Sequence, residues 1–264
     1  MTAAPAATGT AIGMSGVTVR FTSRWSQTTA LDDVSLDIEP GEFVTIVGPS
    51  GCGKSTLLKI VAGLVTPTSG AVSLLQRPVR GPQKEIGFVF QKAALLEWRG
   101  ARANILLQAE MRGMDRAQAS RRADELIEMT GLTGFEKALP HELSGGMQQR
   151  VALCRALLHS PPVLLMDEPF GALDALTREQ MNAELHRIWR ETGTTVVLVT
   201  HSIAEAVFLG TRVVVMSPRP GRIIRTFPVD LPAHRDYASV MSDPRFDRLA
   251  TDLRGLLGSA AANH

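Results

Sequence analysis

The sequence predicts an α/β protein with a mostly parallel sheet, an antiparallel β subdomain at its edge and a helical insertion. The main observation is a set of short apolar runs without alternation, which are typical of parallel strands covered on both faces. Alternating, strand-like segments precede these runs, and a long segment with helical spacing separates the first run from the second. The runs span residues 43–47, 163–166, 196–199 and 213–216.

Two alternating segments near the N-terminus predict half-buried strands. Val17, Val19 and Phe21 lie two residues apart, and the same spacing recurs over residues 34–38. Successive side chains of a strand point to opposite faces, so each segment presents one apolar face. We expect these strands to form the antiparallel sheet, with Phe21 in its core.

Residues 93–160 predict the helical insertion. This range holds no clear strand pattern, and between Ala119 and Thr130 apolar or small residues recur at helical spacing. Charged residues occupy the opposite face, as expected for an amphipathic helix. We therefore expect a helical subdomain between two parallel strands.

Length and composition bound the protein class. The chain has 264 residues, 28 Lys and Arg against 26 Asp and Glu, and two cysteines. A near-neutral chain argues against nucleic acid as the main partner. Cys52 and Cys154 show no paired spacing, which excludes a disulfide scaffold or a Cys-rich zinc site.

The expected domain organisation is simple. We expect a disordered tail over residues 1–13, one domain over residues 14–230, and a short, loop-rich C-terminal tail over residues 231–264. No apolar run approaches the ~20 residues of a membrane span, and no secretory signal is visible. We expect a cytoplasmic protein that contacts a membrane only through a partner.

A glycine-rich loop follows the first apolar run and precedes a helical segment. It fits G-x-x-x-x-G-K-[ST], so we expect a P-loop NTPase core. Glycines let backbone N–H groups surround phosphates, Lys54 would bridge the β- and γ-phosphates of ATP, and Ser55 would bind Mg²⁺. The alternative is a chance glycine-rich turn. The predicted nucleotide-binding residues are Gly48, Pro49, Ser50, Gly51, Cys52, Gly53, Lys54, Ser55 and Thr56.

Three titratable side chains follow two other apolar runs. Asp167 and Glu168 end one run, and His201 follows another. Because the carboxyl ends of parallel strands share one sheet edge, these groups should lie beside the phosphate loop. Asp167 suits Mg²⁺, Glu168 would polarise the attacking water, and His201 would contact the γ-phosphate. The alternatives are a solvated acidic turn and a structural histidine.

The sequence LSGGMQQR at residues 143–150 resembles the signature motif of the ATP-binding cassette (ABC) ATPases. Its position between the phosphate loop and the strand ending in MDEP agrees with that family. Gln91 resembles the Q-loop residue, Asp174 the D-loop residue and His201 the H-loop residue. The resemblance covers roughly residues 14–230, and it implies ATP and Mg²⁺ as cofactors, with Gln91 contacting both.

The signature also predicts a second anion site. Its Ser-Gly-Gly segment precedes a helix expected to start near Met147, where a hydroxyl and bare N–H groups meet the positive helix end. A simple helix cap is the alternative. In the family, two subunits form a head-to-tail homodimer in which each signature covers the partner's ATP. That resemblance assigns contact in trans to Leu143, Ser144, Gly145, Gly146 and Gln148.

Trp25 is the predicted adenine contact, because many family members carry an aromatic residue at this place and indole offers a large π-face. Phe21 is the second candidate. Trp98 and Trp189 are expected to be packing or interface residues.

The segment SPRPGRI at residues 217–223 resembles the nitrate, sulfonate and taurine importer ATPases. That resemblance implies permease subunits in the membrane, a periplasmic or lipid-anchored solute-binding protein, no nucleic acid, and a place on the cytoplasmic face of the bacterial inner membrane. Glu97 departs from the group, which usually has proline there, in a region that contacts the permease. The alternatives are an ABC ATPase of an exporter or of a different nutrient importer, a repair or ribosome-associated ATPase, and a regulatory module without turnover.

Overall fold

A six-stranded sheet forms the centre of the molecule in the computed structural model, which describes residues 9–22, 26–171 and 173–262. Five of its strands are parallel, and the edge strand β10 is antiparallel to β9. The predicted α/β class with a mostly parallel sheet is therefore confirmed. In spatial order the strands are β10 (Ile223–Pro228), β9 (Arg212–Met216), β3 (Phe43–Val47), β8 (Thr195–Val199), β7 (Val163–Asp167) and β6 (Ile86–Val89).

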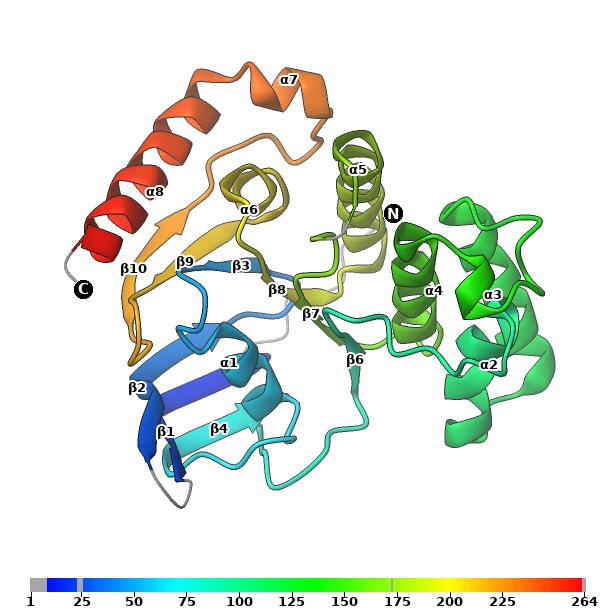
Figure 1. Cartoon of the computed structure of the whole chain (residues 1–264), viewed down its shortest axis with the longest axis horizontal. Helices are drawn as coiled ribbons and strands as arrows, with labels where there is room; N and C mark the ends of the chain where they lie inside the picture. The colour runs from blue at the N-terminus through cyan, green and yellow to red at the C-terminus, as the bar shows by residue number, and fades with distance from the viewer. Residues whose placement is uncertain (1–8, 23–25, 172, 263–264) are drawn as a thin grey trace.

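A second, antiparallel sheet lies beside the first, as predicted, and α1 (Lys54–Val61) lies between the two (Figure 1). The apolar side chains of α1 pack against both sheets in one buried cluster. This arrangement places the start of α1 at the carboxyl end of β3. The strand order of the second sheet is β2 (Gln27–Ile38), β1 (Ile12–Thr22), β4 (Ser69–Leu74) and β5 (Arg77–Pro78).

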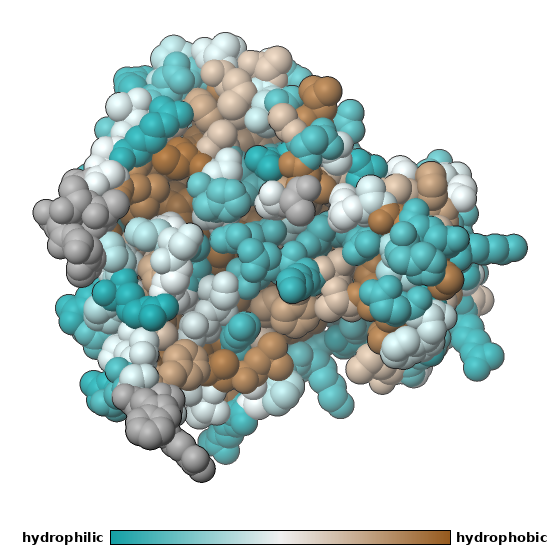
Figure 2. Space-filling model, viewed as in Figure 1, coloured by the Kyte–Doolittle hydropathy of each residue, from teal (hydrophilic) through white to brown (hydrophobic). Residues whose placement is uncertain are grey.

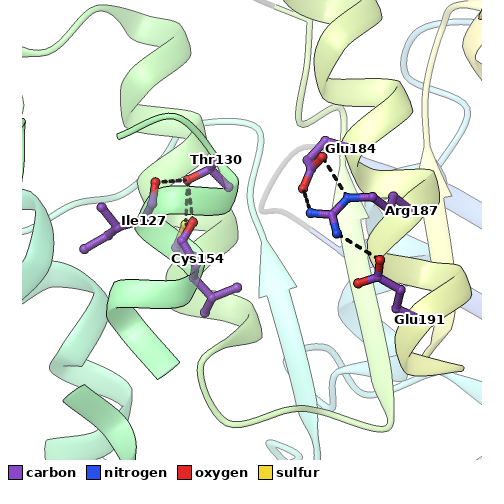
Figure 3. Close-up of polar contacts among 7 residues, drawn as sticks. Ile127, Thr130, Cys154, Glu184, Arg187 and Glu191 are labelled. Atoms are coloured by element: carbon purple, nitrogen blue, oxygen red, sulfur yellow. Dashed lines mark hydrogen bonds and ion pairs between the residues drawn. The ribbon is translucent and has the colours of Figure 1, made fainter. Parts of the chain in front are cut away.

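The helical insertion is also confirmed and forms the lobe on the right of Figure 1. A buried polar contact joins two of its helices: the Thr130 hydroxyl and the Cys154 thiol lie 3.2 Å apart (Figure 3). Burial raises the pKa of Cys154 to about 12, so this thiol stays protonated and serves packing. The lobe contains α2 (Ala101–Arg112), α3 (Arg116–Met129), the 3₁₀ helix η1 (Pro140–Glu142) and α4 (Gly145–Leu157).

The face of the parallel sheet that points away from α1 is covered by α5 (Ala175–Thr192) and α6 (Ile203–Leu209). Trp189 on α5 packs against this core, as predicted, and its indole N–H donates to the carbonyl oxygen of Gly41 at 3.0 Å. On the exposed side of α5, Arg187 pairs with Glu184 and Glu191 (Figure 3). Exposed pairs of this kind contribute little to stability.

Both predicted tails need correction. Ala11 is 1% exposed and its amide donates to Ile38, so ordered structure begins before residue 14. The loop-rich reading of the C-terminal segment is wrong, because it forms α7 (Tyr237–Met241) and α8 (Pro244–Ala262).

A helical face explains the order of the C-terminal segment. Phe246, Ala250 and Leu253 are buried at helical spacing where α8 packs on α6. The buried guanidinium of Arg235 donates to carbonyls at the end of α6, including that of Gly210 at 2.9 Å. We call α7 and α8 together the helical arm. Figure 2 shows apolar surface along the inner side of this helical arm. The arm therefore braces the helix that follows His201.

Candidate functional site

The phosphate loop leaves β3 at the carboxyl edge of the sheet and leads directly into α1. Gly51 and Gly53 adopt left-handed backbone conformations, with φ of 76° and 100°. At Gly53 a side chain is also excluded by space, since a Cβ would lie 2.7 Å from the carbonyl oxygen of Ala30. No side chain caps the first turn of α1, so its N–H groups can serve an anion.

Lys54 holds the loop from within. Its ammonium donates to the carbonyl oxygens of Gly48 and Pro49 at 2.8 and 2.9 Å. Cys52 is 1% exposed, and its Sγ lies 3.9 Å from the same ammonium. Burial raises the pKa of Cys52, so its thiol packs in the loop in protonated form.

The start of α1 and the end of β7 meet through one hydrogen bond. The Ser55 hydroxyl donates to Oδ1 of Asp167 at 2.8 Å. Asp167 is 7% exposed, and desolvation raises its pKa above the ordinary value. These two residues, predicted separately from the sequence, thus form a pair of hard oxygen donors beside the phosphate loop.

Glu168 lies between an amide and an imidazole. Its Oε2 accepts a hydrogen bond from Nε2 of Gln91 at 3.1 Å and lies 3.6 Å from Nδ1 of His201. The backbone of Glu168 is left-handed, with φ of 47°, and its amide donates to Val199 on β8. A non-glycine residue in this conformation is uncommon and clusters at functional sites. The residues that follow β3, β7 and β8 are therefore brought together, as predicted from the sequence.

A pocket of about 470 Å³ is lined by the phosphate loop, Ser55, Gln91 and Glu168. It runs from Phe21 and Thr28 on the antiparallel sheet, past the phosphate loop, to Gln91 and Glu168. One end of the pocket therefore offers an aromatic ring, and the other offers the phosphate loop and polar side chains.

The prediction that Phe21 belongs to the core is wrong, because its side chain is 48% exposed and lines this pocket. The pairing of β1 with β2 shifts register between Val19 and Arg20. Such a shift breaks the strict alternation and turns the following side chains away from the core. Trp25, the predicted adenine contact, lies outside the described residues.

The signature residues lie on the helical lobe. Ser144 caps α4 by accepting from the amide of Met147 at 3.3 Å, so the helix begins at Gly145, two residues earlier than expected. Gln148 donates to the carbonyl oxygen of Pro140 at 2.8 Å. Among the described residues that line the pocket of about 470 Å³, none comes from residues 143–148. Asp174, which resembles the D-loop residue, caps the start of α5, where its carboxylate accepts a hydrogen bond from the amide of Thr177.

Two residues that the sequence analysis missed hold the segment after β6. The buried amide of Gln149 donates to the carbonyl oxygen of Gln91 at 2.6 Å. Arg155 donates to the carbonyls of Ala93 and Ala94 at 2.7 and 2.8 Å. The available signal was a polar residue on the buried face of a helix, which requires a partner.

A groove of about 760 Å³ borders this segment. Phe90 and Met111 line it with apolar surface, and Arg112, Arg155 and His159 add basic or titratable groups. Trp98, which follows the segment, is 76% exposed. Of the two roles expected for it, packing or interface, the exposure contradicts packing within the chain, and the interface role stays a prediction.

In the part of the chain that the structure describes, no three His, Cys, Asp or Glu side chains gather into a metal-holding group. None of the described helices combines the length and apolar character that crossing a membrane requires.

Comparisons with known proteins agree on one family. The model of the ABC transporter family matches residues 31–171. The taurine import ATP-binding protein TauB of Jannaschia sp. is 48% identical over 231 residues, which cover 86% of each chain. Its namesake in Ruegeria pomeroyi is 42% identical over 250 residues, 93% of each chain. The solved dimer of the ATP-binding cassette MJ0796 with ADP and Pi gives a TM-score of 0.76 at 35% identity, covering 84% of this chain and 100% of that one.

Proposed function

The chain belongs to the ABC transporter family and is an ATPase that hydrolyses ATP for transport, and from that premise we propose how its residues divide the work. The observation that carries the proposal is that residues following three strands, β3, β6 and β7, line one pocket, and that His201 after β8 reaches the same site through Glu168. The phosphate loop binds the polyphosphate, Gln91 and Glu168 line the γ end of the pocket, and His201 lies 3.6 Å from Glu168.

Glu168 is the proposed general base. A carboxylate within hydrogen-bond distance of Gln91 and near His201 is positioned to orient a water for attack on the γ-phosphate. His201 contributes a donor for the charge that develops on the γ-phosphate, and Lys54 provides a cation at the same phosphates. These roles convert the positions predicted from sequence into a mechanism.

Ser55 and Asp167 fit a Mg²⁺ ion held together with the nucleotide. A hydroxyl and a carboxylate 2.8 Å apart are hard oxygen donors, and Mg²⁺ is commonly bound by one or two such groups plus phosphates and waters. The buried carboxylate is also one whose charge a cation would compensate. When bound, the ion would neutralise charge on the phosphates. Gln91 is a further oxygen donor within reach of that end of the pocket.

Two copies, facing opposite ways, complete two reaction centres. Ser144, Gly145 and Gly146 form a capped helix start on a separate lobe, outside the pocket of their own chain. A second copy related by two-fold symmetry can place this helix start over the γ-phosphate. Leu143, Gln148 and Asp174 would support that contact.

The transported solute is proposed to be taurine or a similar small sulfonate, because the similar TauB proteins are taurine import ATP-binding proteins. The groove beside Phe90 and Met111 would receive a permease subunit, which in turn receives solute from a binding protein. Exposed Trp98, on the segment that follows β6, would also contact the permease. The chain would then lie on the cytoplasmic face of the bacterial inner membrane.

Mixing two inactive variants tests the shared site. Lys54→Ala removes the phosphate-binding lysine, and Ser144→Arg obstructs the signature, so each alone should lose ATPase activity. In a mixture, heterodimers contain one intact centre, and the rate should recover to about a quarter of the wild-type value at most. No recovery, or full activity in Ser144→Arg alone, would contradict the head-to-tail arrangement.

Reconstitution tests the solute and the direction of transport. Vesicles that contain the complete complex should show taurine-stimulated ATPase activity that depends on the binding protein, together with uptake of labelled taurine. Stimulation by another nutrient would identify a different importer, and movement in the opposite direction would identify an exporter.

A further inference from the structure

The hairpin loop between β9 and β10, residues 217–222, packs directly on the phosphate loop. Gly221 approaches so closely that a Cβ there would lie 1.9 Å from the carbonyl oxygen of Cys52. Arg219 reaches the preceding peptide, where its Nε and Nη2 donate to the carbonyl oxygen of Gly51 at 3.1 and 3.0 Å. One hairpin loop therefore contacts two consecutive peptides of the phosphate loop from outside.

The hairpin loop is itself fixed to the antiparallel sheet. The amide of Gly221 donates to Ala30 at 3.0 Å, and its carbonyl accepts from the amide of Asp32 at 3.0 Å. Arg222 forms an ion pair with the side chain of Asp32. Within the loop, the Ser217 hydroxyl accepts from the amide of Arg222 at 2.9 Å. Arg219 thus extends from a braced turn.

The contact acts on the part of the phosphate loop that needs a left-handed residue. Gly51 has φ of 76°, and its carbonyl oxygen accepts hydrogen bonds from Nε and Nη2 of Arg219. In a trans peptide the carbonyl and the next N–H point in opposite directions, so holding the oxygen fixes the whole peptide plane. Lys54 holds the carbonyls of Gly48 and Pro49 from inside. The loop is therefore held by cations on both sides.

We propose that Arg219 is a positioning residue for nucleotide binding, which acts by holding the Gly51 carbonyl and keeping the phosphate loop in its binding conformation. This inference rests on the proposed nucleotide site. Arg219 is exposed and lines the same pocket as Phe21 and Lys54. Hydrogen bonds from a charged guanidinium to a backbone oxygen are stronger than those between neutral groups. An exposed side chain, by contrast, adds little to the packing of the core. Its loss should therefore weaken binding more than folding.

The test compares Arg219→Ala and Arg219→Lys with Arg225→Ala in the full-length protein. Arg225 is an exposed arginine on the same hairpin, and its guanidinium lies over the ring of Phe227 instead. The measurements are the Kd for Mg·ATP and for ADP, kcat, and amide hydrogen exchange of residues 48–53 without nucleotide.

Arg219→Ala should raise both Kd values by about tenfold, leave kcat at saturating ATP within about twofold, and speed exchange in the phosphate loop. Arg219→Lys keeps the charge but loses the two-donor fork, so it should fall between Arg219→Ala and wild type. Arg225→Ala should match wild type in every measurement.

Unchanged Kd values and exchange in Arg219→Ala would overturn the proposal. Weaker ATP binding with unchanged ADP binding and unchanged exchange would also overturn it, because the arginine would then contact the γ-phosphate or a partner. If wild-type protein bound neither nucleotide, the proposed function would fail, whereas the exchange comparison would still decide whether Arg219 holds the loop.

Discussion

The Ser55 hydroxyl and the Asp167 carboxylate form a 2.8 Å hydrogen bond that joins the first turn of α1 to the end of β7. Ser55 follows the phosphate loop, whereas Asp167 belongs to a strand more than a hundred residues later. The bond lowers the pKa of Asp167, but desolvation is the larger effect and raises it. The site therefore holds a buried acid whose ionised form is favoured once a cation is present.

Asp167→Asn should separate stability from activity. Asparagine keeps an oxygen for the Ser55 hydroxyl but removes a buried charge, so the protein without nucleotide should unfold a few degrees higher (about 2–4 °C) at pH 7.5. Mg²⁺-dependent ATPase activity should be lost, because an amide is a poorer Mg²⁺ ligand. Thermal unfolding and phosphate release measure the two effects. A lower Tm together with normal activity would contradict both assignments.

Glu168→Gln should retain ATP binding and lose turnover. The amide fills the same space near Gln91 and His201 but cannot accept a proton from water, so kcat should fall by about 10²–10⁴-fold. ATP affinity and ATP-dependent dimerisation should stay near wild type, and equilibrium binding together with sedimentation would measure them. Near-normal ATPase activity in this variant would exclude Glu168 as the base.

Local patterns made much of the site predictable. The phosphate loop, Asp167, Glu168 and His201 all follow unbroken apolar runs, and parallel strands necessarily end at one sheet edge. That rule anticipates the contact between Ser55 and Asp167 without any knowledge of distances. The helical insertion was predictable from a different local pattern, because apolar residues recur there at helical spacing over several turns.

Tertiary irregularities set the limit of that reasoning. The register shift after Val19 exposes Phe21, and no residue type in β1 indicates that the register shifts there. Arg235 and the buried face of α8 order the C-terminal segment through contacts with α6, which is distant in sequence. The sequence indicates Arg219 only as part of residues 217–223, which resemble a family segment. Its contact with Gly51 could not be predicted, because that contact depends on how two loops pack.

Phe21→Ala tests the base end of the pocket. If the ring stacks on adenine, its removal should raise the Kd for ATP by about tenfold, because stacking of a base on an aromatic ring contributes about 1–3 kcal/mol. Phe21→Tyr preserves the ring and should bind like wild type. Titration with ATP at fixed Mg²⁺ provides the measurement. Normal affinity in Phe21→Ala with weak affinity in Trp25→Ala would assign the base to Trp25.

The pH dependence of folding should report on His186. This side chain is 3% exposed, and its ring centroid lies 5.4 Å from that of Trp189 and 5.9 Å from that of Phe208. Burial, followed by the nearby Arg235, lowers the pKa of His186 to about 4, against about 6.5 in an unfolded chain. The unfolded state therefore binds the proton more readily. The contribution of His186 to stability is complete above about pH 6.5 and is lost as the pH falls toward 4.

His186→Gln removes this titration while keeping a polar side chain of similar size. The variant should be less stable than wild type at pH 7.5, and the difference should shrink by about 2–3 kcal/mol between pH 7 and pH 4.5. Asp167 and Glu205, whose pKa values are raised by burial, titrate in both proteins and cancel in the comparison. Urea unfolding at each pH gives the free energies, and His141→Gln, at an exposed position, should follow wild type. A constant difference between His186→Gln and wild type across this range would mean that His186 does not resist protonation in the folded protein.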